Sequence, residues 1–200
     1  LMKTAGADRI MAMNLHSPQI QGFANVPCDH LLAGKLMCDA AAQHDLSNGV
    51  VVAPDAGSAK HAGHYAKRLN LPLAILDKRR ADHQENPVME NIIGDVEGKD
   101  AFIFDDEVAS GGSLIEAADM LAKNGAKDIY AFCVHGVLSG AATKRLQESV
   151  IKKLVVTDTV HIPEAKQFPK LEVVSTAELI ANAIIYTNSG RSISGLYSRF

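Results

Sequence analysis

The sequence predicts an α/β fold in which a parallel β-sheet is covered by helices on both faces. Short apolar runs alternate along the chain with segments that have helical spacing. Most of these runs are continuously apolar, which is typical of strands buried on both faces. With 200 residues, 47 % of them apolar, the chain is long enough to bury a sizeable core.

The apolar runs indicate where the strands lie. We expect strands over residues 9–13, 49–53, 73–76, 100–104, 128–134, 153–157 and 171–174. Helices are expected between most of them, over residues 30–44, 59–69, 113–124, 141–148 and 176–187. Strands that alternate with helices form parallel sheets, whose ligands bind beyond the carboxyl ends of the strands. Asp55, Asp105 and Asp106 follow predicted strands and are therefore expected at that edge.

Residues 101–113 read AFIFDDEVASGGS and join a predicted strand to a predicted helix. Gly111 and Gly112 allow backbone N–H groups to approach a phosphate closely, and the N-terminus of the following helix favours an anion. Ser113 and Glu116 have the spacing of a capping box, which predicts that this helix starts at the end of the loop. The loop therefore has the composition of a phosphate site.

Two acids precede the glycine-rich part of this segment. Asp105 and Asp106 would repel a phosphate, so their expected partners are sugar hydroxyls or a divalent cation such as Mg²⁺. A phosphorylated sugar would match both parts of the segment, although an ordinary strand-to-helix turn with two surface acids matches the local pattern almost as well. GxxxxGK[ST] and GxGxxG motifs are absent, which argues against a P-loop or a dinucleotide site of the usual kind.

Composition narrows the class of protein. A net charge of −3 provides no basic field for nucleic acid, and 4 Tyr, 6 Phe and no Trp leave few rings for base stacking. No apolar run approaches the roughly 20 residues that cross a bilayer. The three cysteines lie in apolar contexts without a CxxC motif, so buried free thiols are expected. We therefore predict a cytoplasmic protein with neither nucleic acid nor membrane as a partner.

Several longer segments carry a family resemblance. Residues 14–29 read NLHSPQIQGFANVPCD, and further blocks follow as VAPDAGSAKHA (52–62), LDKRR (76–80), the acid loop (101–113), VHGVLSGAA (134–142) and VVTDTV (155–160). In content and order these blocks resemble the ribose-phosphate diphosphokinase family, also called phosphoribosyl diphosphate (PRPP) synthetases. The acid loop also resembles the ribose 5-phosphate loop of type I phosphoribosyltransferases. The resemblance covers effectively the whole chain.

The resemblance implies a phosphoribosyltransferase-like parallel sheet and a specific reaction. The diphosphoryl group of ATP would be transferred to the 1-hydroxyl of ribose 5-phosphate, giving PRPP and AMP for nucleotide synthesis. Mg²⁺ would be the cofactor. The family forms homo-oligomers, dimers that assemble into hexamers, so a homo-oligomer is expected.

The resemblance also implies roles for particular residues. Lys78 matches the family's catalytic lysine, and Arg80 matches its partner arginine. His16 and Asp55 match metal-associated residues. The residues that match the ribose 5-phosphate site are Arg80, Asp105, Asp106, Ala109, Ser110, Gly111, Gly112 and Ser113. The polar segment after Arg80, residues 81–91, is expected to be a mobile flap that closes over the triphosphate.

Considered singly, these residues also allow structural roles. The KRR sequence could be a solvated strand end, a lone His16 could be structural, and Asp55 could begin a turn before its helix. His135, at the end of a predicted strand, could line the ribose side or make a structural hydrogen bond. The joint occurrence of His16 and Asp55 within family blocks favours their functional roles.

Three positions depart from the family pattern. Asn14 and Asn25 stand where the family usually has Asp, so weaker metal affinity is expected. Ala109 replaces the acid that is usual in the ribose 5-phosphate loop, but backbone donors at residues 110–113 do not depend on that side chain.

The resemblance also suggests a division of the chain. The first residue is Leu1, and residues 1–10 read as the tail of a helix followed by a strand. We expect residues 1–32 to be a remnant of an N-terminal phosphoribosyltransferase-like domain and residues 33–187 to be the C-terminal one. Residues 188–200 are expected to be a strand that returns to the N-terminal domain. This chain alone is expected to have weak or no activity.

Two other functions remain open. A non-catalytic regulatory relative would keep the fold and modulate an active partner, but the retained Lys78 and Arg80 argue against it. A phosphoribosyltransferase that consumes PRPP would share the ribose loop. The NLHSPQIQGF block is typical of the synthetases instead.

Overall fold

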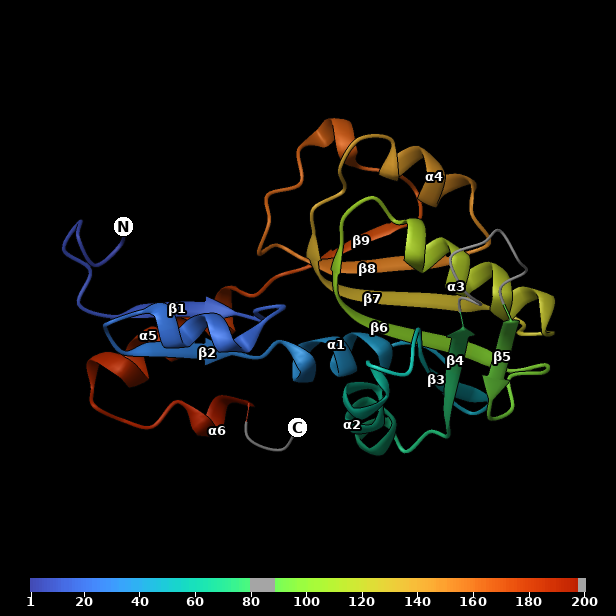
Figure 1. Ribbon diagram of the computed structural model, residues 1–200, viewed down its shortest axis with the longest axis horizontal. Helices are drawn as coiled ribbons and strands as arrows, with labels where there is room; N and C mark the ends of the chain where they lie inside the picture. The colour runs from blue at the N-terminus through green and yellow to red at the C-terminus, as the bar shows by residue number, and fades with distance from the viewer. Residues whose placement is uncertain (80–88, 198–200) are drawn as a thin grey trace.

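The computed structural model of the chain describes residues 1–79 and 89–197 (Figure 1). Most of them form a seven-stranded sheet with helices on both faces, which confirms the predicted fold class. A two-stranded sheet lies beside this main sheet, together with the last two helices (Figure 1). Within the described ranges, no helix combines the length and apolar character needed to cross a membrane.

The main sheet has the strand order β5-β4-β3-β6-β7-β8-β9. All neighbouring strands are parallel except β5, which is antiparallel to β4. The strands are β3 (Gly49–Ala53), β4 (Leu73–Arg79), β5 (Met89–Ile93), β6 (Asp100–Val108), β7 (Ile129–Gly136), β8 (Lys153–Thr157) and β9 (Leu171–Val174). Because β3, β6 and β7 are neighbours in this order, their carboxyl ends meet at the middle of one edge.

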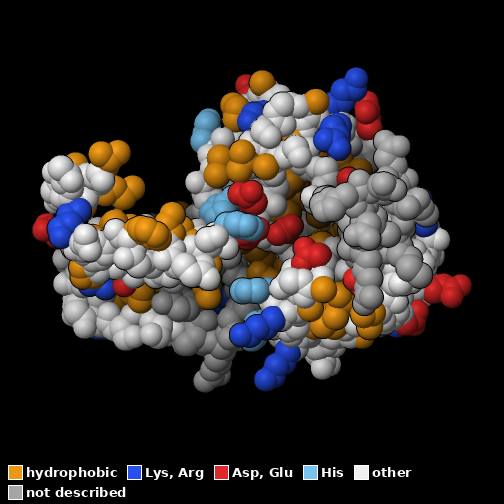
Figure 2. All heavy atoms as spheres, in the orientation of Figure 1, with side chains coloured by type: hydrophobic (Ala, Val, Ile, Leu, Met, Phe, Trp, Pro, Cys, Tyr) orange, Lys and Arg blue, Asp and Glu red, His pale blue; other side chains and the backbone are white. Residues whose placement is uncertain are grey.

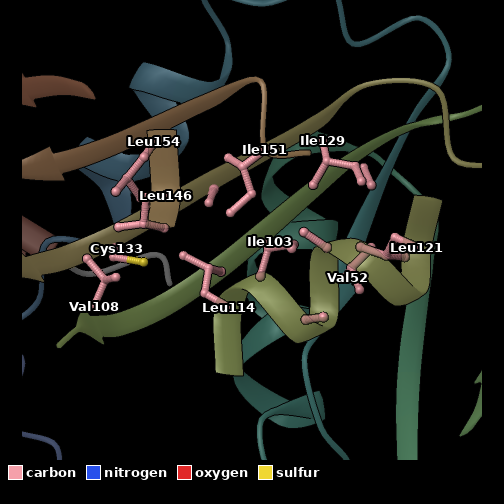
Figure 3. Packing of buried hydrophobic residues seen from close by; sticks show 14 of the residues in the cluster. Val52, Ile103, Val108, Leu114, Leu121, Ile129, Cys133, Leu146, Ile151 and Leu154 are labelled. Atoms are coloured by element: carbon pink, nitrogen blue, oxygen red, sulfur yellow. The ribbon is translucent and has the colours of Figure 1, made fainter. Parts of the chain in front are cut away.

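Side chains that alternate along the strands divide the core into two clusters. On one face, Val52 and Ile103 pack beneath α3 (Gly112–Lys123) and α4 (Ala142–Glu148), as Figure 3 shows from close by. On the other face, Phe102 and Phe104 pack against α1 (Gly34–Ala41) and α2 (Ala59–Leu69). The ring of Tyr65 on α2 stacks on Phe104 with 4.1 Å between centroids. Continuous apolar runs are needed because both faces of these strands are covered.

The two-stranded sheet consists of β1 (Ile10–Met13) and β2 (Cys28–Leu31), which run parallel in the register Ile10↔Cys28 to Met13↔Leu31. The 3₁₀ helix η1 (Pro18–Phe23) lies between them in the chain, and a second, η2 (Glu164–Lys166), precedes β9. Beside this sheet lie α5 (Ala177–Asn188) and α6 (Ser194–Tyr197), at the left of Figure 1.

The start of α5 is tied to the main sheet. Asp158, directly after β8, accepts hydrogen bonds from the Thr176 N–H at 2.7 Å and from the Ser175 hydroxyl at 2.6 Å. Ile180 and Ile184 of α5 line an apolar hollow together with Met11 and Met13 of β1. Because this apolar side of α5 faces β1, the helix lies with the two-stranded sheet, although our division placed residues 176–187 in the larger domain.

Some predicted bounds need correction, and one strand was missed. The helix predicted over residues 30–44 begins only at Gly34, because residues 28–31 pair with β1 as strand β2. The strand predicted to end at Phe104 continues to Val108, because β7 provides main-chain partners that far along. Asp105 and Asp106 are therefore strand residues. Strand β5 was not predicted.

The strand predicted over residues 188–200 is not formed in the described part, residues 188–197. There α5 ends at Asn188, and the short helix α6 follows. A strand needs a neighbour for its N–H and C=O groups. Here the turn after α5 is closed locally instead, since the Ser189 hydroxyl donates to the Ile185 carbonyl at 2.7 Å and the Arg191 N–H donates to the Tyr186 carbonyl at 2.8 Å.

All three cysteines are free thiols, as predicted. Cys38 and Cys133 are buried, whereas Cys28 is half-buried in β2. Burial raises the pKa of the Cys38 thiol to about 12, and it also raises that of Cys133. These two thiols are therefore unreactive core residues.

Candidate functional site

Acidic and histidine side chains gather where the carboxyl ends of the central strands face the two-stranded sheet. Asp105 and Asp106 lie near the end of β6, Asp55 follows β3, and His16 follows β1. Figure 2 shows red acidic and pale blue histidine side chains side by side near the centre of this face. The topology thus brings together residues that are up to 90 positions apart in the sequence.

The adjacent carboxyl groups of Asp105 and Asp106 differ in their electrostatics. The Asp106 N–H donates to Asp105 Oδ1 at 2.8 Å. Burial, the interaction with Asp106 and the charge of Asp55 raise the pKa of Asp105 to about 7. Burial acts in the same direction on Asp106, but hydrogen bonds with Asp105 and His16 outweigh it and lower the pKa of Asp106. At neutral pH Asp106 is therefore ionised, whereas Asp105 is protonated in part of the molecules.

His16 contacts this pair directly. Its Nδ1 lies 2.5 Å from Asp106 Oδ2. The imidazole is otherwise exposed, with 79 % of the side chain accessible, and the carboxylate raises the pKa of His16. Sequence reasoning assigned His16 to a metal and Asp106 to the ribose, whereas the structure makes them hydrogen-bond partners.

The turn that presents His16 depends on Asn14, one of the departures from the family pattern. Asn14 has a left-handed backbone with φ of +43°, a conformation that Asn tolerates better than most residues. Its side-chain oxygen accepts a hydrogen bond from the Ala33 N–H at 2.7 Å. The next amide, Leu15 N–H, donates to His30 Nε2 at 2.8 Å. Asn14 thus has a structural role at the end of β1.

Asp55 has two roles, one in closing a turn and one in the electrostatics of Asp105. Its Oδ1 accepts a hydrogen bond from the Ser58 N–H at 2.7 Å. This bond closes the turn before α2, which was the structural role considered for Asp55 from the sequence. Its charge also contributes to the raised pKa of Asp105, so it acts on the same region of the site.

The donor groups at this edge suit Mg²⁺ in one of its usual modes of binding. Among the described residues, no three His, Cys, Asp or Glu side chains converge as a closed metal cage. Burial, Asp106 and the charge of Asp55 disfavour the ionised form of Asp105, and a cation bound beside it would favour that form. Mg²⁺ is commonly held by one or two carboxylates together with waters and substrate phosphates. The carboxylates present fit that mode of binding.

The loop after β6 has the geometry of an anion site. Gly111 is the N-cap residue of the 12-residue helix α3 and has φ of +75°. A Cβ at this position would lie 3.2 Å from the Leu146 side chain of α4, so both backbone and packing favour glycine. The predicted capping box is wrong, because α3 begins at Gly112 and Ser113 lies inside its first turn. The first amides of α3 point into the loop.

The rest of the loop is anchored by its neighbours. Ser139 N–H donates to the Ala109 carbonyl at 2.9 Å, and the Ser110 hydroxyl accepts from the Gly112 N–H at 3.4 Å. Arg145 of α4 donates from Nη1 to the Ser110 carbonyl at 3.3 Å. Sequence reasoning missed Arg145, although its position in the helix after the VHGVLSGAA block was a usable signal. The structure thus adds a cation beside the phosphate loop.

The two predicted catalytic residues are described only in part. Lys78 belongs to β4, where its backbone pairs with Glu90 of β5, at the carboxyl half of a strand that runs parallel to β3. Arg80 lies outside the described residues, as do residues 81–88 of the predicted flap.

Comparisons with known proteins identify the family of the chain. The family described as phosphoribosyl synthetase-associated domain matches residues 80–198. The chain is 48 % identical over 199 residues to a ribose-phosphate pyrophosphokinase of Caldanaerobacter subterraneus, covering 99 % of this chain and 63 % of that protein. It is 43 % identical over 198 residues to that of Bacillus subtilis, covering 99 % and 62 %. The chain thus spans somewhat less than two thirds of the length of these relatives.

A solved structure is also similar. The crystal structure of phosphoribosylpyrophosphate synthetase from Mycobacterium smegmatis matches with a TM-score of 0.86 and 40 % sequence identity. The match covers 94 % of this chain and 61 % of that one. The arrangement of the main and two-stranded sheets is therefore shared with a protein of known structure.

Proposed function

Since the chain belongs to the phosphoribosyl synthetase family, we propose that the protein transfers the diphosphoryl group of ATP to the 1-hydroxyl of ribose 5-phosphate, giving PRPP and AMP. One observation supports this most directly. The carboxyl pair Asp105–Asp106 and the amide-lined loop at residues 109–113 follow one another at the carboxyl end of β6. Carboxylates that accept hydrogen bonds from sugar hydroxyls, placed next to a loop that binds phosphate, suit ribose 5-phosphate.

In this proposal the loop binds the acceptor substrate. Backbone N–H groups of residues 110–113 donate to the 5-phosphate, and the positive end of α3 adds to the attraction. Asp106 and Asp105 accept hydrogen bonds from the ribose hydroxyls. Ala109, Ser110, Gly111, Gly112 and Ser113 keep the roles implied by the family, and Arg80 is assigned to the same substrate.

Transfer of the diphosphoryl group depends mainly on positioning and on neutralising charge. We assign Lys78 and Arg80 to the charge that develops on the transferred phosphoryl oxygens. His16 and Asp55 are assigned to the metal side of the site, where they would help to hold Mg²⁺, which would neutralise charge on the triphosphate. His16 also orients Asp106, because the two side chains are hydrogen-bonded. The partners are thus ATP and ribose 5-phosphate, and a homo-oligomer in the cytoplasm is part of the proposal.

Ribose-dependent release of AMP tests the proposal. The natural-length protein, incubated with ATP and Mg²⁺, should form AMP only when ribose 5-phosphate is present, and PRPP should form in equal amount. Ribose without the phosphate should be inactive at the same concentration, because the loop would have no anion to bind. Absence of ribose 5-phosphate-dependent AMP would overturn the proposed reaction. PRPP consumption with a nucleobase would point instead to a phosphoribosyltransferase.

A further inference from the structure

His135 connects the main sheet to the segment that carries His16. It lies in β7 near its carboxyl end and is half-buried. Its Nε2 is 3.1 Å from the Met13 carbonyl oxygen and 3.2 Å from the Asn14 carbonyl oxygen, both at the end of β1. On the other side of the ring, Nδ1 is 2.8 Å from the Thr159 hydroxyl. One imidazole therefore joins three segments that are distant in the sequence.

The partners determine which ring nitrogen donates. Carbonyl oxygens only accept hydrogen bonds, so Nε2 must carry a proton and donate to Met13 and Asn14. The Thr159 hydroxyl can serve either role toward Nδ1. It is itself held by the buried Thr157, whose hydroxyl lies 2.8 Å from Thr159 Oγ1 and donates to the Val134 carbonyl at 2.7 Å. The ring is thus oriented by β8 and directed at β1.

The other partners of this segment come from β2 and the residues after it. Asn14 N–H donates to the Leu31 carbonyl at 2.9 Å, and the Leu15 N–H donates to His30 Nε2. The side-chain oxygen of Asn14 accepts from the Ala33 N–H. Those bonds hold the segment within the two-stranded unit. The His135 bond instead comes from the sheet that holds Asp106.

The strand ladder relates His135 to the acid pair. In the register of β6 and β7, Asp105 is paired with Cys133 and Glu107 with His135. The backbone at Asp106 and the backbone at His135 are therefore held at a set spacing by main-chain hydrogen bonds. The contact of His135 with residues 13 and 14 therefore joins the segment before His16 to the strand that lies next to Asp106.

We propose that His135 is a positioning residue, which holds His16 against Asp106 through the carbonyl oxygens of Met13 and Asn14. The inference rests on the proposed function, in which these two side chains face Mg²⁺ and ribose. Removal of the imidazole leaves two carbonyls without their donor and frees the turn at residues 14–16 from the main sheet. A side chain that restores an N–H donor at that position restores the function in part.

The test compares His135→Ala with His135→Gln in the natural-length protein. His64→Ala, an exposed histidine on α2, is the matched control. We expect His135→Ala to lower kcat about 10-fold or more while the Kd for ribose 5-phosphate, measured by calorimetry, changes less than about 2-fold. His135→Gln should recover a large part of kcat, since its amide can donate to the same carbonyls. Equal losses in the two variants, or a loss in Kd that matches the loss in kcat, would overturn the proposal.

A double-mutant cycle separates positioning from a general loss of stability. If His135 acts through His16, then His135→Ala should have little further effect on kcat in a His16→Ala protein. Multiplicative losses in the double variant would overturn the proposal. The variants are compared at temperatures well below their unfolding midpoints.

Hydrogen exchange provides a readout that does not depend on activity. The Leu15 amide is protected by His30, so its exchange rate reports opening of this turn. In His135→Ala this amide should exchange at least about tenfold faster, while amides of β6 and β7 keep their rates. Unchanged exchange at Leu15 would overturn the positioning role even in an active enzyme. If the parent protein releases no AMP, the proposed reaction fails, and the exchange rates alone decide whether His135 holds the turn.

Discussion

The backbone N–H of Asp106 donates a hydrogen bond to the carboxylate of Asp105 at 2.8 Å, and the two neighbouring carboxyl groups have pKa values shifted in opposite directions. The cause is their different surroundings. Asp105 is the more deeply buried, whereas Asp106 has His16 as a partner. Adjacent residues of one strand thus carry a protonatable group and a stable anion.

The raised pKa of Asp105 should make stability depend on pH. A carboxyl group with a raised pKa in the folded state binds protons more tightly there, so its contribution is full below the unfolded pKa of about 4 and is lost as pH rises through about 7. Asp105→Asn should therefore raise the urea midpoint at pH 7.5 and change it much less at pH 4. An equal change at both pH values would contradict the burial of the charge.

The hydrogen bond between His16 and Asp106 should be visible in the titration of the imidazole. The carboxylate raises the pKa of His16 above its ordinary value, so the protonated ring persists to higher pH. Asp106→Asn should lower the pKa of His16, as followed by NMR of the ring protons. As a control, Asp39→Asn removes a carboxylate that pairs with Lys35 and should leave His16 unchanged. If the pKa of His16 is the same in Asp106→Asn as in the parent protein, the contact is not made in solution.

Lys78 should affect chemistry more than binding. Lys78→Ala is expected to lower kcat about 100-fold or more, because the proposed partner is the developing phosphoryl charge. The Kd for ribose 5-phosphate should remain nearly unchanged. Lys60→Ala, an exposed lysine on α2, is the control in the same AMP-release assay. A parallel loss of kcat and ribose 5-phosphate affinity would assign Lys78 to substrate binding instead.

Gly111 should be sensitive to a single methyl group. Gly111→Ala forces a side chain into a backbone with φ of +75° and places Cβ 3.2 Å from Leu146, so we expect a loss of about 1–3 kcal/mol in unfolding free energy. Ribose 5-phosphate affinity should fall as well. The control is Gly98→Ala, which has φ of +68° with no heavy atom within 4 Å of the new Cβ. This variant should lose stability by backbone strain alone and keep its affinity.

Arg145 should contribute to binding of the 5-phosphate. Its guanidinium lies at the loop, 3.3 Å from the Ser110 carbonyl, where its charge reaches a bound anion. Arg145→Met should weaken ribose 5-phosphate binding several-fold, roughly 3–10-fold, with a smaller loss at high salt. Lys144→Met changes the neighbouring exposed cation and should have little effect. Equal effects of the two substitutions would indicate a general field instead of a specific contact.

Local pattern was sufficient for much of the main sheet. The strands at residues 49–53, 153–157 and 171–174 and the helix at residues 59–69 have the bounds that were predicted. Each is apolar or amphipathic over its own length, so its formation depends little on distant residues. The extension of β6 to Val108 was missed because DDE is polar, and only the pairing with β7 makes it a strand.

The sequence by itself determined the fold class through its periodicity, the residue types of the acid pair and the glycine loop through local chemistry, and the family through the resemblance of its blocks. Only the tertiary structure decided that β2 pairs with β1, that His16 meets Asp106, and that His135 reaches the carbonyls of Met13 and Asn14. These contacts join residues from 18 positions apart, as for Ile10 and Cys28, to 122 positions apart, where no local pattern specifies a partner. They follow from strand order and register, which are set by the packing of the whole sheet.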